Sequence, residues 1–185
     1  MRPRTRELLA HLDGHHAELR RAVDTVPVAL RARPPAADRW SVANVLEHLA
    51  IVERRVVQGL ARGLAEARSG GLPPDTDASV VRPADIARYL DRERRLVAGA
   101  ASQPTGHVAA EEAWAAIEEV RGSTRALVVE TDEIAVDAVV LPHPVFGPLD
   151  FYQWIVFLGG HEGRHALQVR EIGRAVARHG DRRGP

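Results

Sequence analysis

Two histidines in the C-terminal part of the chain, His161 and His165, stand four residues apart. On a helix, positions i and i+4 lie on the same face one turn apart, so both imidazoles can reach one ion. The string His161-Glu162-Gly163-Arg164-His165 also has the form H-E-x-x-H, in which two histidines bind zinc and the glutamate is the general base of a peptidase. The pair therefore predicts a metal site, and the rest of the chain must decide which kind.

A peptidase of this type takes a third metal ligand downstream of the second histidine. The position six residues after His165 is Glu171 rather than histidine, and the only acid beyond it is Asp181, close to the last residue of the sequence. Such peptidases also align their substrate along a strand edge, and the sequence predicts no suitable strand. We therefore interpret the match to the peptidase motif as fortuitous.

The two histidines occupy core positions of the last predicted helix. Its inward stripe advances in steps of three and four residues through Phe151, Trp154, Leu158, His161, His165, Gln168, Ile172 and Val176. A buried imidazole or amide needs a partner. A single core histidine usually has a hydrogen-bond partner within the protein. Two histidines on one stripe beside Gln168 make a metal site as strong an interpretation as two histidines that are only hydrogen-bonded.

A third ligand should come from upstream, where there are five candidates: His48, His107, His143, His11 and His15. His48 is favoured because it lies within a predicted helix, on the edge of that helix's apolar stripe. The two candidates on the first helix are expected to be ordinary helix residues, and the other two fall in irregular segments. Three imidazoles leave an open position on Zn²⁺ or a similar ion, which is the arrangement of a catalytic site.

Composition excludes several other kinds of protein. The chain has no cysteine, so it has no disulfide, no thiolate ligand and no catalytic thiol. Its 25 basic and 25 acidic side chains give a formal net charge of zero, so we expect no nucleic-acid partner. The N-terminus begins an amphipathic helix rather than a signal sequence, and no apolar stretch approaches the roughly 18–20 residues that span a bilayer. We expect a cytoplasmic protein without a membrane partner.

Apolar periodicity predicts an all-α fold, a four-helix bundle. Ser41 and Asp150 are expected to cap the second and fourth helices. The four long helices are expected at 4–26, 41–67, 110–131 and 151–179. We expect one domain over residues 1–180 and a mobile tail at 181–185.

The connections between these helices differ in length. A long middle connection at 68–110 joins the second helix to the third and is expected to hold a short helix at 83–98. A stiff, extended crossing with three prolines is expected at 141–149. A short strand is allowed at 134–141.

Four short motifs resemble, in their order and spacing, those of the DinB/YfiT-like superfamily: Trp40-Ser41, Asn44-Val45-Leu46-Glu47-His48-Leu49, Gly147-Pro148-Leu149 and His161-x-x-x-His165-x-x-Gln168-x-x-Glu171-Ile172. The resemblance spans nearly the whole chain. It implies a four-helix bundle that holds a divalent metal through three ligands, which fall on His48, His161 and His165. Zinc is the ion we expect first, with nickel or iron as alternatives. Relatives with E-x-x-x-H in place of H-x-x-x-H exist, so the ligand set does not fix the chemistry.

The resemblance also implies activities on small molecules. Characterised relatives include transferases and isomerases that use mycothiol, bacillithiol or glutathione, and proteins described as metal-dependent hydrolases. We favour the hypothesis of a thiol transferase, in which the ion holds the thiol of a small cosubstrate as the thiolate. Arg55 and Arg164, near the mouth of the bundle, would bind the carboxylates of that cosubstrate. The resemblance points to a homodimer as well.

Two alternative hypotheses stay open. In a metal-dependent hydrolase, the ion would activate a bound water and Glu162 would act as general base, although a helix turns Glu162 about 100° away from His161. In a non-enzymatic stress-response or binding protein, the ion would only stabilise the bundle. A purely structural bundle with coincidental histidines is the remaining interpretation.

Overall fold

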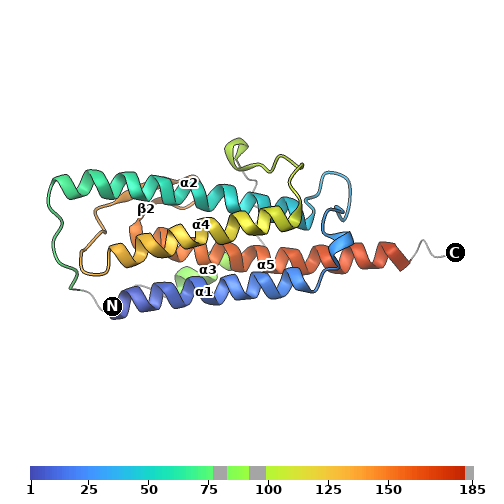
Figure 1. The fold of residues 1–185 in the computed structure, drawn as a ribbon, viewed down its shortest axis with the longest axis horizontal. Coiled ribbons are helices and arrows are strands. Elements are labelled where there is room, and N and C mark those ends of the chain that lie inside the picture. The colour runs from blue at the N-terminus through green and yellow to red at the C-terminus, as the bar shows by residue number, and fades with distance from the viewer. Residues whose placement is uncertain (77–82, 92–98, 182–185) are drawn as a thin grey trace.

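The computed structural model describes residues 1–76, 83–91 and 99–181. Four long helices form an elongated bundle (Figure 1), which confirms the predicted fold: α1 (Pro3–Asp24), α2 (Val42–Ser69), α4 (Ala110–Glu130) and α5 (Phe151–Asp181). Of the tail expected at 181–185, Asp181 belongs to α5, and residues 182–185 lie outside the described part of the chain. No described helix combines the length and the hydropathy that a membrane span requires.

The two helices that carry the predicted metal ligands both begin at reciprocal caps. At the start of α2, the Ser41 hydroxyl accepts the Asn44 N–H at 3.2 Å, and the Asn44 side-chain oxygen accepts the Ser41 N–H at 3.0 Å. At the start of α5, Asp150 and Gln153 exchange the same two bonds, at 2.8 and 3.0 Å. Each pair satisfies N–H groups that a helix start leaves without a partner, so both starts are fixed locally, as the sequence predicts.

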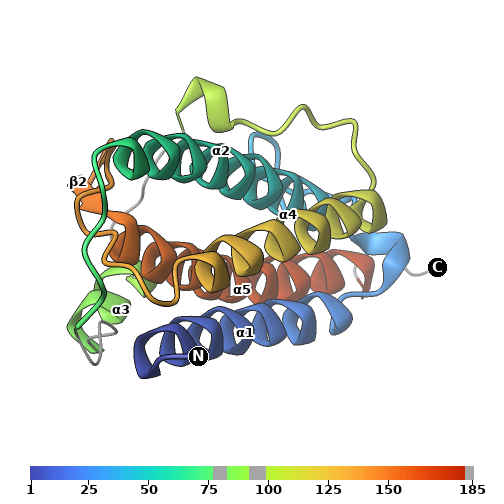
Figure 2. The same cartoon turned by 60° about the vertical axis from the view of Figure 1, so that its left-hand side comes forward.

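The core consists of two apolar clusters with a polar zone between them. α1 lies along α5 and α2 along α4 (Figure 2). On α5 the first cluster ends at Leu158 and the second begins at Ala166, and on α4 the corresponding gap lies between Ile117 and Leu127. All four long helices contribute to the zone between the clusters, which we call the polar layer: His16, Glu53, Arg121, Thr124 and Glu162.

The middle connection returns to the bundle at two places. Its helix α3 (Pro83–Leu90) packs against α5, and the short helical turn η2 (Ala100–Ser102) packs against α2. The helix expected at 83–98 is confirmed in its first part. α3 ends at Leu90, and residues 92–98 of the predicted helix lie outside the described residues. The middle connection thus covers the bundle in two places, on α5 and on α2.

The crossing expected at 141–149 is a β-hairpin rather than an unpaired segment. β1 (Val140–His143) pairs antiparallel with β2 (Gly147–Asp150), with Val140 opposite Asp150 and His143 opposite Gly147. Gly147 has a φ of +78°, which residues with a side chain rarely adopt. The prolines are compatible with this pairing, because each strand of a two-stranded sheet has an outer edge where no partner strand needs a backbone N–H. The strand allowed at 134–141 is realised only from Val140 onward, apart from an isolated bridge at Ile134.

Candidate metal centre

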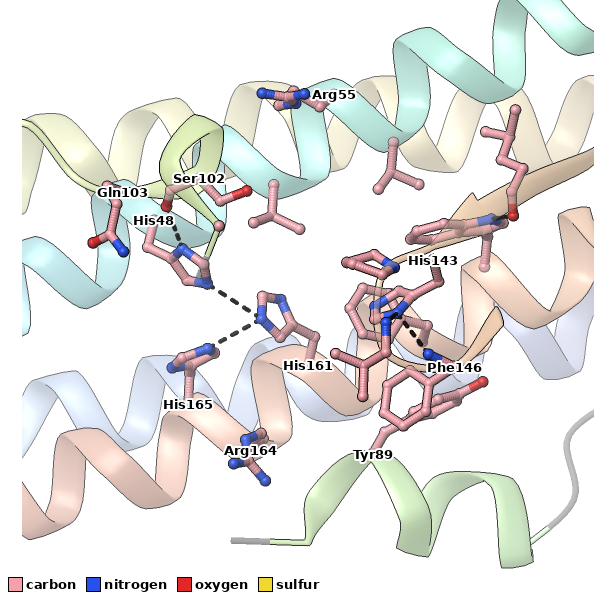
Figure 3. Close-up of a pocket in the computed structure, with 18 of the residues that line it drawn as sticks. His48, Arg55, Tyr89, Ser102, Gln103, His143, Phe146, His161, Arg164 and His165 are labelled. Atoms are coloured by element: carbon pink, nitrogen blue, oxygen red, sulfur yellow. Dashed lines mark hydrogen bonds between the residues drawn. The ribbon is translucent and has the colours of Figure 1, made fainter. Parts of the chain in front are cut away.

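Three histidines converge between α2 and α5. His48 comes from α2 and is 5% exposed, while His161 and His165 come from successive turns of α5. The Nε2 atom of His161 lies 3.3 Å from Nε2 of His48 and 3.1 Å from Nε2 of His165 (Figure 3). One nitrogen from each ring falls within 4.8 Å of the other two. The structure therefore brings together the three residues that the sequence nominates, and we call them the histidine cluster.

Hydrogen bonds fix which nitrogen of two of these rings carries the proton. His48 Nδ1 lies 2.7 Å from the Ser102 carbonyl oxygen, and His165 Nδ1 lies 2.8 Å from the side-chain oxygen of Gln168. Both oxygens only accept, so both Nδ1 atoms are the N–H donors. The Nε2 lone pairs of both rings are then directed at the centre of the cluster, which is how metal-binding histidines are oriented in proteins.

Two of the three nitrogen–nitrogen distances match those around a metal ion, and all three nitrogens lie within 4.8 Å of one another. Two facing lone pairs repel unless a proton or a cation lies between them. A tetrahedral ion with Zn–N distances of about 2.0–2.1 Å holds its nitrogens about 3.3–3.4 Å apart, close to the observed 3.1 and 3.3 Å. Residues of this type at this spacing can hold Zn²⁺, Ni²⁺ or Fe²⁺, because imidazole suits all three.

Electrostatics keeps the cluster in its metal-binding form. Burial lowers the pKa of His161 well below its usual value, and the neighbouring His165 and His48 lower it further. Burial also lowers the pKa of His48, against an opposing effect of its hydrogen bond to Ser102. Both rings are therefore neutral at pH 7, and a neutral imidazole is the species that binds a metal.

The carboxylate of Glu47, next to His48, holds the segment 101–106, and the Ser102 carbonyl of this segment orients the His48 ring. Glu47 accepts hydrogen bonds from the N–H and the hydroxyl of Thr105, at 2.8 and 2.6 Å, and from the N–H of Gly106 at 3.2 Å. Arg55 donates to the carbonyl of Ala101 at 2.9 Å from the other side. These bonds anchor the segment on α2 so that the Ser102 carbonyl meets the His48 ring. Sequence analysis did not identify Glu47 or Ser102, because their contacts span more than fifty residues.

A cavity of about 830 Å³ opens beside the histidine cluster, and all three of its histidines line the wall. The two arginines predicted to bind a cosubstrate, Arg55 and Arg164, line the same wall. His143 of the β-hairpin also lines it, with its ring centroid 4.6 Å from that of Phe157. A site of this size next to three inward-facing imidazoles can admit a small molecule.

Glu162 lies on the other side of α5. Its side chain is 1% exposed, and its carboxylate lies 3.1 Å from Nδ1 of His16 and 3.0 Å from a guanidinium nitrogen of Arg121. It is absent from the lining of the cavity. The helical rotation between neighbouring residues thus directs His161 to the cavity and Glu162 to the polar layer, a position that does not support the general-base role.

The remaining candidate ligands make other contacts. His11 bonds to the Val156 carbonyl at 2.9 Å, and His15 lies 3.3 Å from the Glu18 carboxylate. Both rings pack on α5 where it carries glycine, and a Cβ added at Gly163 would meet His15 at 2.6 Å. The two rings therefore serve the close approach of α1 to α5. His107, with an exposed side chain, lies outside the cluster.

The fold and the site together define a four-helix bundle with a three-histidine cluster on its central cavity. Residues 11–169 match the DinB superfamily, and the chain belongs to that family. It is also 28% identical, over 145 residues, to the uncharacterized protein YuaE of Bacillus subtilis (strain 168); the match covers 78% of this chain and 83% of YuaE. No solved structure matches the chain significantly. The family agrees with the resemblance seen in the sequence motifs.

Proposed function

We propose that this protein binds one divalent metal ion through His48, His161 and His165, and that it acts as a metal-dependent enzyme on a small molecule. A single observation carries the proposal: three Nε2 atoms, two of them with the tautomer already fixed, converge on the wall of a cavity. Zinc is the ion expected first. Membership of the DinB superfamily is consistent with this function and does not specify the reaction.

Among the reactions open to such a site, we favour transfer of a low-molecular-weight thiol. A divalent ion lowers the pKa of a thiol that binds to it and so supplies a thiolate at neutral pH. The chain has no cysteine, so that thiol must belong to a cosubstrate of the mycothiol, bacillithiol or glutathione kind. Arg55 and Arg164 lie on the same wall as the histidine cluster and are the groups we assign to its carboxylates.

The alternatives have less support from the geometry. A hydrolase that uses Glu162 as general base needs this carboxylate in the cavity, whereas it is bound to His16 and Arg121. A bundle in which the metal is only structural needs a closed ligand set, whereas this cluster opens to a cavity of about 830 Å³.

Metal analysis and a thiol-conjugation assay test the two levels of the proposal separately. Purified protein should contain close to one ion per chain, His48→Ala should lose it, and His107→Ala should retain it. Stoichiometric metal in His48→Ala would overturn the ligand set. The zinc-loaded protein is then assayed with mycothiol, bacillithiol and glutathione, each with an organic halide as the electrophile, so that the thiolate forms the C–S bond as the halide ion leaves. No conjugation with any of the three thiols would reject the transferase while leaving the metal site in place.

A further inference from the structure

The wall of the cavity is unusually rich in aromatic side chains. The chain has only eight Trp, Tyr and Phe residues, and five of them line this cavity: Trp40, Tyr89, Phe146, Trp154 and Phe157. An aromatic fraction of 4% for the whole sequence makes this concentration specific to the site. Aromatic side chains in a cavity of this kind bind apolar, and above all flat, parts of a ligand.

The aromatic surface is continuous from the β-hairpin to the histidine cluster. The His143 ring lies 4.7 Å from Phe146 and 5.2 Å from Trp154, between centroids. Phe157 stacks on His161 at 5.1 Å with an interplanar angle of 19°. Figure 3 shows His143 and Phe146 grouped on one side of His161, and His48 and His165 on its other side. We call Phe146, Trp154, Phe157 and His143 the aromatic wall.

His143 adds a neutral hydrogen-bond donor to the aromatic wall. Its Nδ1 accepts from the N–H groups of Val145 and Phe146, at 3.0 and 3.1 Å, so the ring proton sits on Nε2. Burial, with a smaller effect of Arg88, lowers the pKa of His143 to about 4, which keeps the ring neutral. Within the described structure nothing accepts from the Nε2–H, so this donor is open to a ligand.

Helix α2 and the segment just before it contribute arginines to the lining of the cavity. Arg55 and Arg62 lie seven residues apart on α2, hence on one face of that helix, and Arg39 lies just before it. None of these three guanidinium groups forms an ion pair with another described residue. Among the lining residues that the structure describes, Asp38 has the only carboxylate. Figure 3 shows Arg55 on α2, across the cavity from Tyr89 on α3.

We propose that this cavity takes an aromatic carboxylate as its organic substrate: the ring lies against the aromatic wall, and the carboxylate binds the guanidinium group of Arg62, while Arg55 stays with the thiol cosubstrate. The Nε2–H of His143 donates to an acceptor atom of the same molecule. The proposal names the substrate class of the proposed enzyme and rests on that function for the reaction. It does not depend on the reaction for binding, because ring and charge are recognised by side chains outside the histidine cluster.

Calorimetric titration with three probes separates the two recognition elements. The probes are 2-naphthoate, its uncharged analogue 2-naphthamide, and cyclohexanecarboxylate, which has the charge without an aromatic ring. We expect 2-naphthoate to bind about tenfold more tightly than either of the others. Each titration is run with zinc-loaded and with zinc-free protein, because a carboxylate can also bind the ion itself. A preference seen only with zinc would overturn the assignment to Arg62.

Variants with a matched control assign the recognition to residues. Arg62→Gln should weaken 2-naphthoate binding about tenfold and leave 2-naphthamide unchanged. Arg54→Gln is the control, because Arg54 lies on α2 3.8 Å from Glu119 and does not line the cavity. Phe146→Leu keeps an apolar side chain and should weaken both naphthalene probes. His143→Phe removes the Nε2–H donor together with the Nδ1 acceptor of the Val145 and Phe146 N–H groups, and should weaken 2-naphthoate about threefold.

The outcomes distinguish this proposal from the proposed function. If the zinc-loaded protein conjugates thiols but binds 2-naphthoate no more tightly than cyclohexanecarboxylate and 2-naphthamide, the substrate class is wrong and the transferase stands. If selective binding of 2-naphthoate is lost in Arg62→Gln but retained in Arg54→Gln, and no thiol is conjugated, the substrate class stands and the transferase is rejected. Equal losses in both arginine variants would overturn the present proposal.

Discussion

Two polar clusters occupy the centre of this bundle, and adjacent residues of α5 belong to different ones. His161 belongs to the histidine cluster, which has three imidazoles, no carboxylate within it and one side open to the cavity. Glu162 belongs to the polar layer, in which carboxylates and cations are matched inside the protein. The rotation of about 100° per residue separates the two environments.

The carboxylates and cations of the polar layer face one another, although Nε and Nη1 of Arg121 make no hydrogen bond within the described structure. A guanidinium nitrogen of Arg121 lies 2.9 Å from Glu53 and 3.0 Å from Glu162, and Thr124 donates to the other oxygen of Glu53. His16 lies 3.1 Å from Glu162 through one ring nitrogen and 3.3 Å from Glu118 through the other. Two buried carboxylates thus face one guanidinium and one imidazole, and a third carboxylate, that of the exposed Glu118, lies at the other ring nitrogen of His16.

The difference shows how a structural polar cluster can be told from a binding site. Buried polar groups are almost always satisfied. In the polar layer the chain supplies the partners, so the cluster contributes to folding. In the histidine cluster the outer nitrogens of His48 and His165 bond to oxygen atoms, and the inner nitrogens of the three rings face one another at the wall of the cavity. The comparison predicts opposite responses to substitution in the two clusters.

The largest effect is expected in the polar layer. Arg121→Met leaves the buried carboxylates of Glu53 and Glu162 without their shared cation and should lower the free energy of unfolding by about 3–5 kcal/mol. Urea unfolding of zinc-free protein measures this loss. Arg121→Lys keeps the positive charge and should recover part of it. An Arg121→Met variant as stable as the parent protein would show that the polar layer is not a structural element.

Glu162→Gln tests the same comparison on the residue that the peptidase motif would make catalytic. The substitution should lower the free energy of unfolding by about 1–3 kcal/mol, because it weakens the bonds to His16 and Arg121. Bound zinc and the pH dependence of any activity should be unchanged. An unchanged free energy of unfolding together with a shifted pH–rate profile would show that Glu162 takes part in the reaction.

A third prediction concerns removal of the metal. At free zinc of about 100 times the dissociation constant, binding to the folded state alone should raise the free energy of unfolding by about 2.7 kcal/mol. Chelation should remove this increment, and His48→Ala should not show it at all. Thermal unfolding with and without zinc measures both. If zinc stabilised His48→Ala as much as the parent protein, the ion would bind elsewhere.

The segment that orients His48 should contribute a smaller amount. Glu47→Gln weakens the anchor on Thr105 and Gly106, so the Ser102 carbonyl should hold His48 less firmly in its tautomer. Loss of such an outer contact should weaken zinc binding about tenfold. Nitrogen NMR of the zinc-free protein would show His48 sampling both tautomers. A zinc affinity and an NMR signal equal to those of the parent protein would reduce Glu47 to a loop contact.

The parts predictable from sequence are those set by local periodicity and caps. The four helices follow from apolar stripes, and Ser41 and Asp150 mark two of their starts. The spacing of His161 and His165 indicates a shared face, and the helical position of His48 made it the best upstream candidate. These features depend on residues within one or two turns of each other, which is the range that a sequence pattern encodes.

The parts that could not be predicted depend on contacts between distant segments. The hairpin at 140–150 escaped prediction because its prolines resemble an unpaired crossing. The partners of Glu162 could not be named, because His16 and Arg121 reach it only after α1 and α4 have packed on α5. The two sides of the cavity likewise come from α2, α5 and the hairpin, which the sequence does not place against one another.

The smallest expected effect is the pH dependence contributed by His16. Burial lowers its pKa, but the hydrogen bond and charge of Glu162, with help from Glu118 and against Arg121, raise it above the usual value overall. A histidine with a raised pKa in the folded state contributes stability that is fully present below the unfolded pKa of about 6.5 and is lost as the pH rises through the folded pKa. His16→Gln should therefore destabilise zinc-free protein more at pH 6 than at pH 9. Urea unfolding of both proteins at the two pH values measures this difference, in which the titration of the histidine cluster cancels. A constant difference would mean that His16 is neutral and that the polar layer carries a net charge.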